Sequence, residues 1–115
     1  MDKVSASGKT LTEFSNAIVA LHRRHFGRGP GSAKSFVSEG IAVCVLSDVY
    51  TPVERTLIDA GQLDHVRESR MLHQAALEDE YRQVAEEVLG RKVEAVLSAI
   101  HVDPDVATET FLLGD

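Results

Sequence analysis

The sequence contains little of what disulfide-bonded or membrane-spanning proteins need. Its one cysteine, Cys44, has no partner for an internal disulfide, which fits a reducing compartment. The longest apolar run, Ile41 to Leu46, is far shorter than the roughly 20 residues of a membrane-spanning helix. The residues after Met1 include no apolar segment of the kind found in secretory signals. We therefore expect a cytoplasmic protein without direct membrane insertion.

Basic residues are also scarce. The chain has 12 Lys and Arg residues against 18 Asp and Glu residues, for a formal net charge of −6. A basic stripe is the usual mark of a nucleic-acid-binding surface, so the acidic balance argues against a nucleic-acid partner. The local exception is the short segment from His22 to Arg28, in which arginines are concentrated.

The length and composition are those of one folded domain. A chain of 115 residues can form a core of its own and leaves little room for two domains. Apolar residues make up 43% and charged residues 26%, as in average globular proteins. Residues 1–9 are small and polar, so we expect a flexible N-terminus followed by a single domain over residues 10–115.

Two longer segments have the apolar period of helices. The first should begin at Thr10, since Glu13 stands three positions on in the capping-box spacing, and it should end at Gly27. The other runs over residues 63–89, and Gly90 provides its stop. Apolar residues recur every three or four positions in both, which predicts one buried stripe on each helix.

A shorter helix between them has the clearest local signal in the chain. Thr51 is a favourable N-cap, Pro52 suits the first helical position, and Glu54 completes a capping box. Gly61 should end this helix. These residues form a structural motif that fixes where the helix begins and ends.

Four segments have strand character. The run from Ile41 to Leu46 is apolar at every position, which predicts an interior strand covered on both faces with Cys44 buried inside it. The last long segment alternates, with Val93, Ala95 and Leu97 expected on the same face. The predicted strands cover residues 33–38, 41–47, 92–103 and 106–113, with tight turns at 39–40 and 103–105.

The predicted order of elements is α-β-β-α-α-β-β. Two hairpins and a block of helices, without alternating βαβ units, indicate an α+β fold with a four-stranded antiparallel sheet and helices packed on one face. The other face, or an open edge, must be shielded. A homodimer is the simplest arrangement that does so, and two-fold symmetry is the commonest.

The residues give no catalytic or metal constellation. There is no Gly-x-Ser-x-Gly elbow, and the run around Cys44 has no adjacent base. His22 and His25 could share a metal, but no carboxylate or thiol lies near in sequence and the arginines between them would repel a cation. We expect no catalytic residues, no metal and no cofactor, hence a protein that is not an enzyme.

Two groups of residues are candidates for binding an anion or an acidic partner. The first is the glycine-rich connection after the first helix, in which Gly27, Gly29 and Pro30 lie beside Arg24 and Arg28. A helix stop followed by a tight connection explains the same glycines.

The second group is a pair of arginines near the start of the long helix. Arg67 and Arg70 are one helical turn apart and could clamp a carboxylate or a phosphate. The alternative is salt bridging with Glu54, Asp64 or Glu68.

Three segments together resemble one protein family. His25–Pro30 is similar to a Gly-x-Gly-Pro signature, and Tyr50–Leu57 to a Leu-Thr-Pro-x-Glu-x-x-Leu signature followed by Gly61 and Arg70. The closing segment Glu109–Leu113 resembles a Val/Phe/Leu strand. With their order along the chain, these segments resemble the MpsC family. Tyr50 stands where that signature has leucine.

The resemblance implies a role in a Na⁺-translocating, membrane-potential-generating system that is linked to inorganic-carbon uptake. It carries over no catalytic residues. The expected function is a non-catalytic accessory or regulatory subunit, held at the inner face of the cell membrane by an ion-translocating protein partner. The alternative is a cytoplasmic small-anion or nucleotide sensor that acts as a homodimer.

Overall fold

The computed structural model, which describes residues 7–114, confirms the predicted order of helices and strands. Residues 1–6 of the expected flexible N-terminus lie outside the described range, whereas Gly8 and Lys9 are helical. The elements are α1 (Gly8–Phe26), β1 (Ser32–Ser38), β2 (Ile41–Ser47), α2 (Pro52–Asp59), α3 (Leu63–Leu89), β3 (Val93–His101) and β4 (Val106–Leu113).

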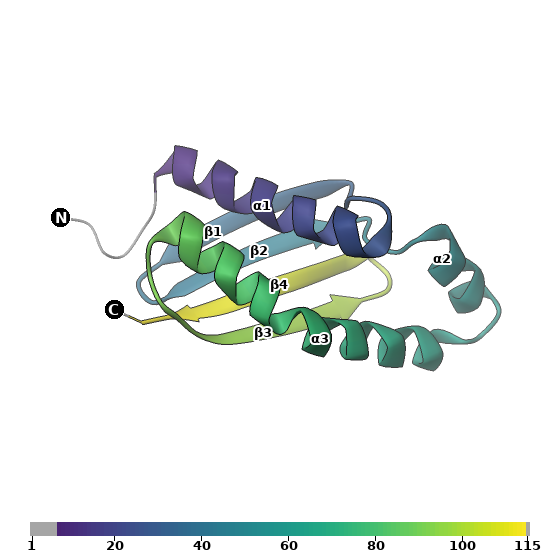
Figure 1. Cartoon of the computed structure of the whole chain (residues 1–115). Helices are drawn as coiled ribbons and strands as arrows, with labels where there is room; N and C mark the ends of the chain where they lie inside the picture. The colour runs from purple at the N-terminus through teal and green to yellow at the C-terminus, as the bar shows by residue number, and fades with distance from the viewer. Residues whose placement is uncertain (1–6, 115) are drawn as a thin grey trace.

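The four strands form one sheet in the order β1-β2-β4-β3, and every neighbouring pair is antiparallel. Helices α1 and α3 lie across the same face of this sheet (Figure 1). The short helix α2 projects beyond one end of the sheet, opposite the end at which α1 begins (Figure 1). The fold is therefore α+β with two layers, as the sequence predicts.

The boundaries of α1 correct one sequence prediction. The helix begins at Gly8, two residues before Thr10, because the Ser7 hydroxyl accepts a hydrogen bond from the Thr10 N–H at 3.2 Å and caps the helix. The expected capping box of Thr10 and Glu13 is therefore wrong. The end of the helix is as predicted, since Gly27 has φ 80°, a left-handed conformation that costs glycine little.

The motif that begins α2 is confirmed in full. The Thr51 side chain accepts a hydrogen bond from the Glu54 N–H at 3.2 Å, and Glu54 Oε1 accepts one from the Thr51 N–H at 2.8 Å. Pro52 is the first helical residue, and Gly61, with φ 79°, lies just beyond the helix end. Glu54 is thus fixed by local structure before any tertiary contact is considered.

The core lies between the two long helices and the sheet. Phe14 of α1 and Phe111 of β4 meet edge to face with ring centroids 5.4 Å apart, and Cys44 is fully buried, as predicted. Buried residues come from every strand face that points to the helices: Ser35 of β1, Ala42, Cys44 and Leu46 of β2, Val93 of β3, and Ala107, Glu109, Phe111 and Leu113 of β4.

Two strand predictions are wrong. The prediction that β2 is covered on both faces fails because the helices cover only one face, and Ile41 on the other face is 46% exposed. The expected alternation in β3 is broken by a register shift between Val93 and Ala95. This bulge leaves Val93 buried, whereas Leu97 lies on the face without helices and is 56% exposed.

A matched pair of leucine substitutions measures the contribution of this one-sided core. Leu46→Ala should lower the free energy of unfolding by about 2–5 kcal/mol, since Leu46 is fully buried and its loss leaves a cavity. Leu72→Ala on the exposed surface of α3 should change it by less than about 0.5 kcal/mol. Urea denaturation compares the two, and equal losses would contradict the assigned core.

Candidate functional site

The most connected polar group of the structure is the guanidinium of Arg70 in α3, which is only 3% exposed. Its Nε and Nη2 atoms donate to Oε2 and Oε1 of Glu54 in α2, each at 2.6 Å. Two parallel bonds of this kind match the planar guanidinium fork to the carboxylate and are stronger than a single charged contact. Arg70 and Glu54 thus form a bidentate ion pair in which the guanidinium is buried and the carboxylate side chain is 15% exposed.

The same guanidinium contacts two more segments. Its Nη2 atom also donates to the Val49 carbonyl at 2.8 Å, and Nη1 lies 3.2 Å from Nε2 of His22 in α1. It stacks on two aromatic rings, with its central carbon 4.0 Å from the Phe26 centroid and 5.4 Å from that of Tyr50. One side chain therefore ties together α1, α2, α3 and the connection between β2 and α2.

Glu54 holds its negative charge in this buried position. Burial would raise the pKa of its carboxyl, but hydrogen bonds from Arg70 and from the Thr51 N–H outweigh this and hold the pKa below its ordinary value. Glu54 thus caps α2 and pairs with Arg70 at the same time.

His22 is neutral in this cluster. Burial and the adjacent positive charge of Arg70 lower its pKa to about 4. A neutral ring has one donor and one acceptor nitrogen, so Nε2 accepts from Arg70 while Nδ1–H donates to the Arg28 carbonyl at 3.3 Å. The histidine therefore links the loop after α1 to the ion pair.

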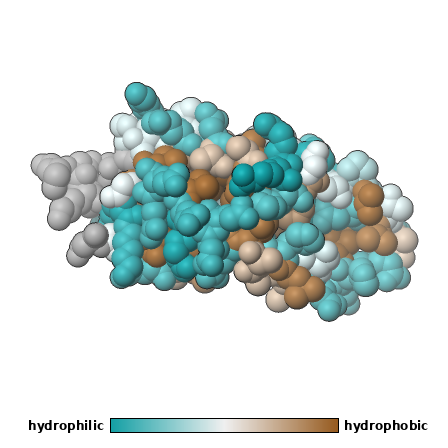
Figure 2. Space-filling model, in the orientation of Figure 1, coloured by the Kyte–Doolittle hydropathy of each residue, from teal (hydrophilic) through white to brown (hydrophobic). Residues whose placement is uncertain are grey.

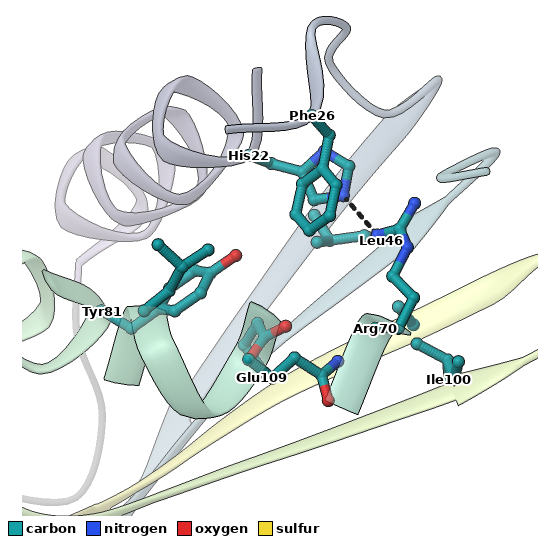
Figure 3. Close-up of a pocket in the computed structure, with 10 residues that line it drawn as sticks. His22, Phe26, Leu46, Arg70, Tyr81, Ile100 and Glu109 are labelled. Atoms are coloured by element: carbon teal, nitrogen blue, oxygen red, sulfur yellow. Dashed lines mark hydrogen bonds between the residues drawn. The ribbon is translucent and has the colours of Figure 1, made fainter. Parts of the chain in front are cut away.

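A cavity of about 10 Å³ lies beside this cluster, between α3 and the sheet (Figure 3). Tyr81 of α3 and Glu109 of β4 line it, as do His22 and Arg70 (Figure 3). Such a volume is near the smallest that can hold one water molecule. The lining also includes Phe26, Leu46, Gln74, Leu77, Ile100 and Ala107.

Glu109 is a buried carboxyl group that forms no salt bridge with any residue in the range 7–114. It is 3% exposed and accepts a hydrogen bond from the Ser98 hydroxyl of β3. Burial raises its pKa to about 7, and burial likewise raises the pKa of the Tyr81 hydroxyl. The cavity thus lies between an ionised pair and a carboxyl group that titrates near neutral pH.

The arginines expected to bind an anion are placed differently from one another. Arg70 is buried with its donors already satisfied, whereas Arg67 is exposed and has no hydrogen bond or ion pair with residues 7–114. The two do not form a clamp, and the alternative of a salt bridge from Arg70 to Glu54 is the observed one. Arg24 is also largely exposed and pairs with Glu80 at 2.8 Å.

The glycine-rich connection is occupied by the protein's own groups. Arg28 donates to the Asp48 and Tyr50 carbonyls, each at 2.9 Å, and to the Asp48 carboxylate at 3.0 Å. A Cβ on Gly29 would lie 3.3 Å from the Arg23 side chain, next to Pro30. The loop therefore packs against side chains of the same chain. The anionic group beside it is the Asp48 carboxylate.

Three contributors to this region were missed by sequence reasoning: His22 as an acceptor for Arg70, Tyr81 as a cavity-lining hydroxyl, and Glu109. Glu109 gave a usable signal, because it takes an inward position between Ala107 and Phe111 in an alternating strand. His22 gave none, since its partner lies 48 residues away in the chain.

The fold and this site define a two-layer α+β domain whose helices are joined by a buried arginine–glutamate pair. Among residues 7–114, no helix is long and apolar enough to cross a membrane, and no group of three or more His, Cys, Asp or Glu side chains is placed to hold a metal ion.

A family model described as "Na+-translocating membrane potential-generating system (MpsC)" matches residues 6–115. The chain belongs to the MpsC family, as the resemblance carried by its three segments indicated. Neither the curated proteins nor the solved structures contain a match to the chain.

Removing one member of the ion pair should destabilise the fold strongly. Arg70→Met leaves the Glu54 carboxylate buried without its partner, so the free energy of unfolding should fall by about 3–5 kcal/mol. Arg82→Met removes only exposed contacts to Glu78 and Asp79 at 3.4 Å and should cost less than about 1 kcal/mol. Urea denaturation measures both; a Glu54→Gln/Arg70→Met double variant, which keeps a side chain able to cap α2, that is no more stable than Arg70→Met would argue against the pair.

The buried Glu109 carboxyl predicts an unusual pH dependence. In the folded protein it keeps its proton up to about pH 7, whereas the unfolded chain releases it near the ordinary value of 4.5. The folded state then binds more protons between these values, so this group lowers the free energy of unfolding as pH rises from 4.5 to 7. Glu109→Gln should therefore stabilise the protein at pH 8, by on the order of 1–3 kcal/mol, and much less at pH 5.

His22 changes the pH dependence of stability in the opposite direction, and it is still present in the Glu109→Gln variant. Its folded pKa of about 4 lies below the ordinary 6.5, so its contribution is lost as pH falls through that window. Denaturation of Glu109→Gln should thus show stability that rises from pH 4 to 6.5. A Glu87→Gln variant on the exposed side of α3 is the control; the same pH profile for both variants would refute the role of Glu109.

Proposed function

We propose that this chain is a non-catalytic accessory or regulatory component of the Na⁺-translocating, membrane-potential-generating system after which its family is named. Membership of the MpsC family supports the link to that system. The observation that carries the accessory role is that the charged groups of the polar cluster, Arg70 and Glu54, bind each other. Its charged groups fix the shape of the protein and contact one another in place of a substrate.

These groups hold α2 (Pro52–Asp59) in place at one end of the molecule. We call the exposed surface at this end the α2 platform. The Arg70–Glu54 pair and the bonds from Arg55 to Asp48 and Asp105, at 2.7 and 2.6 Å, anchor α2 and the connection before it. Hydrophobic residues reach the surface at this end, as they do in the middle of the same side, among mostly hydrophilic ones (Figure 2). We propose that the chain binds its partner through this surface. The partner is the cytoplasmic face of a membrane-embedded component.

Two residues of this surface are exposed and available for contact with a partner. Val53 on α2 is 71% exposed, and Arg67 on α3 is exposed and holds no ion pair with residues 7–114, so both are available to a partner. Arg70 and Arg28 lie in the same region but donate to the chain's own carboxylates and carbonyls. Neither arginine offers the open guanidinium that an anion sensor would need, so we favour partner binding over the sensor alternative.

Co-purification tests this function directly. The tagged chain is expressed together with the membrane components of the system, extracted in mild detergent, and the recovered components are quantified. Val53→Glu and Arg67→Glu should each weaken recovery about tenfold or more, because a charge is introduced or reversed at the contact. Val53→Glu should fold normally, since a carboxylate is favourable in the first turn of a helix.

The control is Lys9→Glu, an exposed charge reversal at the start of α1, at the far end of the molecule from α2 (Figure 1). It should leave recovery unchanged. If wild type recovers no membrane component, the proposed function is wrong; if all three variants lose recovery equally, the surface is wrong.

A further inference from the structure

Among residues 7–114, no helix packs on the face of the sheet that points away from α1 and α3. The strand registers place its outward side chains in four rows that run across β1, β2, β4 and β3. The rows are Ser38-Ile41-Leu112-Ala95, Phe36-Val43-Thr110-Leu97, Lys34-Val45-Thr108-Ala99 and Ser32-Ser47-Val106-His101. We call this set the open face.

The open face is apolar and almost without charge. Although 18 of the 115 residues are Asp or Glu, none of them occupies these rows, and Lys34 is the one Lys or Arg residue among them. The Lys34 ammonium group lies 5.6 Å from the centroid of the Phe36 ring on the same face. Hydroxyl groups supply most of the remaining polarity.

Large apolar side chains on this face stand in water in the single chain. Leu97 is 56% exposed, Phe36 51%, Ile41 46% and Leu112 38%. They come from all four strands, so they form one continuous patch and are not scattered positions. Patches of this kind on a soluble protein usually mark an interaction surface.

We infer that a second copy of this chain covers the open face, so that two sheets pack face to face around a two-fold axis. The distribution of charge favours a second copy over an anionic lipid surface as the occupant of this face. Each copy carries a formal net charge of −6, so association through charged surfaces is opposed, whereas the four rows of the open face hold no carboxylate and Glu94 lies beside them only at the bulge of β3. An anionic lipid surface would require a basic rim, and Lys34 alone does not provide one.

The size of the open face is adequate for a specific dimer. Four strands spaced about 4.8 Å apart and seven residues long, at about 3.3 Å each, give a footprint of roughly 450 Å². Two copies bury at least twice this footprint, and the side-chain relief adds to it, which reaches the roughly 1,000 Å² expected of a specific interface. Two sheets at the usual spacing of about 10 Å would interdigitate these side chains as in a β-sandwich.

Two-fold packing also gives the central threonines a partner. Thr108 and Thr110 lie in β4, one of the two inner strands, and their hydroxyls can bond to each other across the axis. The β2 residues Val43 and Val45 pack beside them. The arrangement explains why β2 is apolar on both faces, since its second face lies inside the dimer.

The test is the oligomeric state of the purified full-length chain, which needs no component of any membrane system. Sedimentation velocity and light scattering should show a dimer at micromolar concentration. Leu97→Glu and Leu112→Glu place like charges on the interface twice per dimer and should weaken association about a hundredfold or more. Leu72→Glu is the matched control, a leucine 66% exposed on α3, and should remain dimeric.

A second measurement on the wild type is independent of whether the variants fold. Acylation of Lys34 should slow as protein concentration rises, because the open face becomes covered, whereas acylation of Lys9 should not. A monomer at about 100 µM would overturn the inference, since specific homodimers associate well below this concentration. Dimerisation unaffected by both open-face variants, or abolished equally by Leu72→Glu, would overturn it too.

Discussion

The Arg70–Glu54 ion pair is the interaction on which the arrangement of the helices depends. It is bidentate, its guanidinium is buried and its carboxylate largely so. Each partner is held by a second set of contacts: Glu54 by the cap of α2, and Arg70 by the Val49 carbonyl, His22 and two aromatic rings. A buried pair has a high desolvation cost, which is offset only when the geometry is good and the remaining donors are satisfied. Both conditions are met here, so the pair defines one relative position for α1, α2 and α3.

The charge of this pair shapes the groups around it. Arg70 keeps His22 neutral and so gives it the role of a hydrogen-bond acceptor, which in turn fixes the loop after α1 through the Arg28 carbonyl. Across the small cavity, Glu109 has a hydroxyl partner in place of a cation and therefore binds its proton more tightly than an ordinary carboxyl group. Two carboxyl groups in one core thus differ in protonation because their neighbours differ.

The two faces of the sheet have different roles. One face carries the helices and the polar cluster, which anchor the α2 platform that we assign to a partner. The other is the open face, whose uncharged rows suit a second copy of the chain. The two surfaces point in different directions, so a dimer formed through the open face would present two α2 platforms at once. Binding at both would raise the effective concentration of the second contact.

The elements of the fold could be read from local signals. Thr51, Pro52 and Glu54 specified the start of α2 within the sequence, and the glycines at 27, 61 and 90 specified the helix ends. Where prediction failed, a short-range alternative was available: Ser7 was a better cap than Thr10, and a bulge reset the alternation of β3. The covering of β2 could not be read, because an apolar strand looks the same whether its second face meets a helix or another molecule.

The sequence by itself thus determined the order of the elements, the α+β class, the family and the local position of Glu54, since these depend on contacts within a few residues or on motifs. Only the tertiary structure decided what Arg70 does. An arginine on a helix surface and one in a buried ion pair have the same local sequence signal. The difference arises from Glu54, 16 residues away, and His22, 48 residues away, which reach Arg70 only when the helices pack on the sheet.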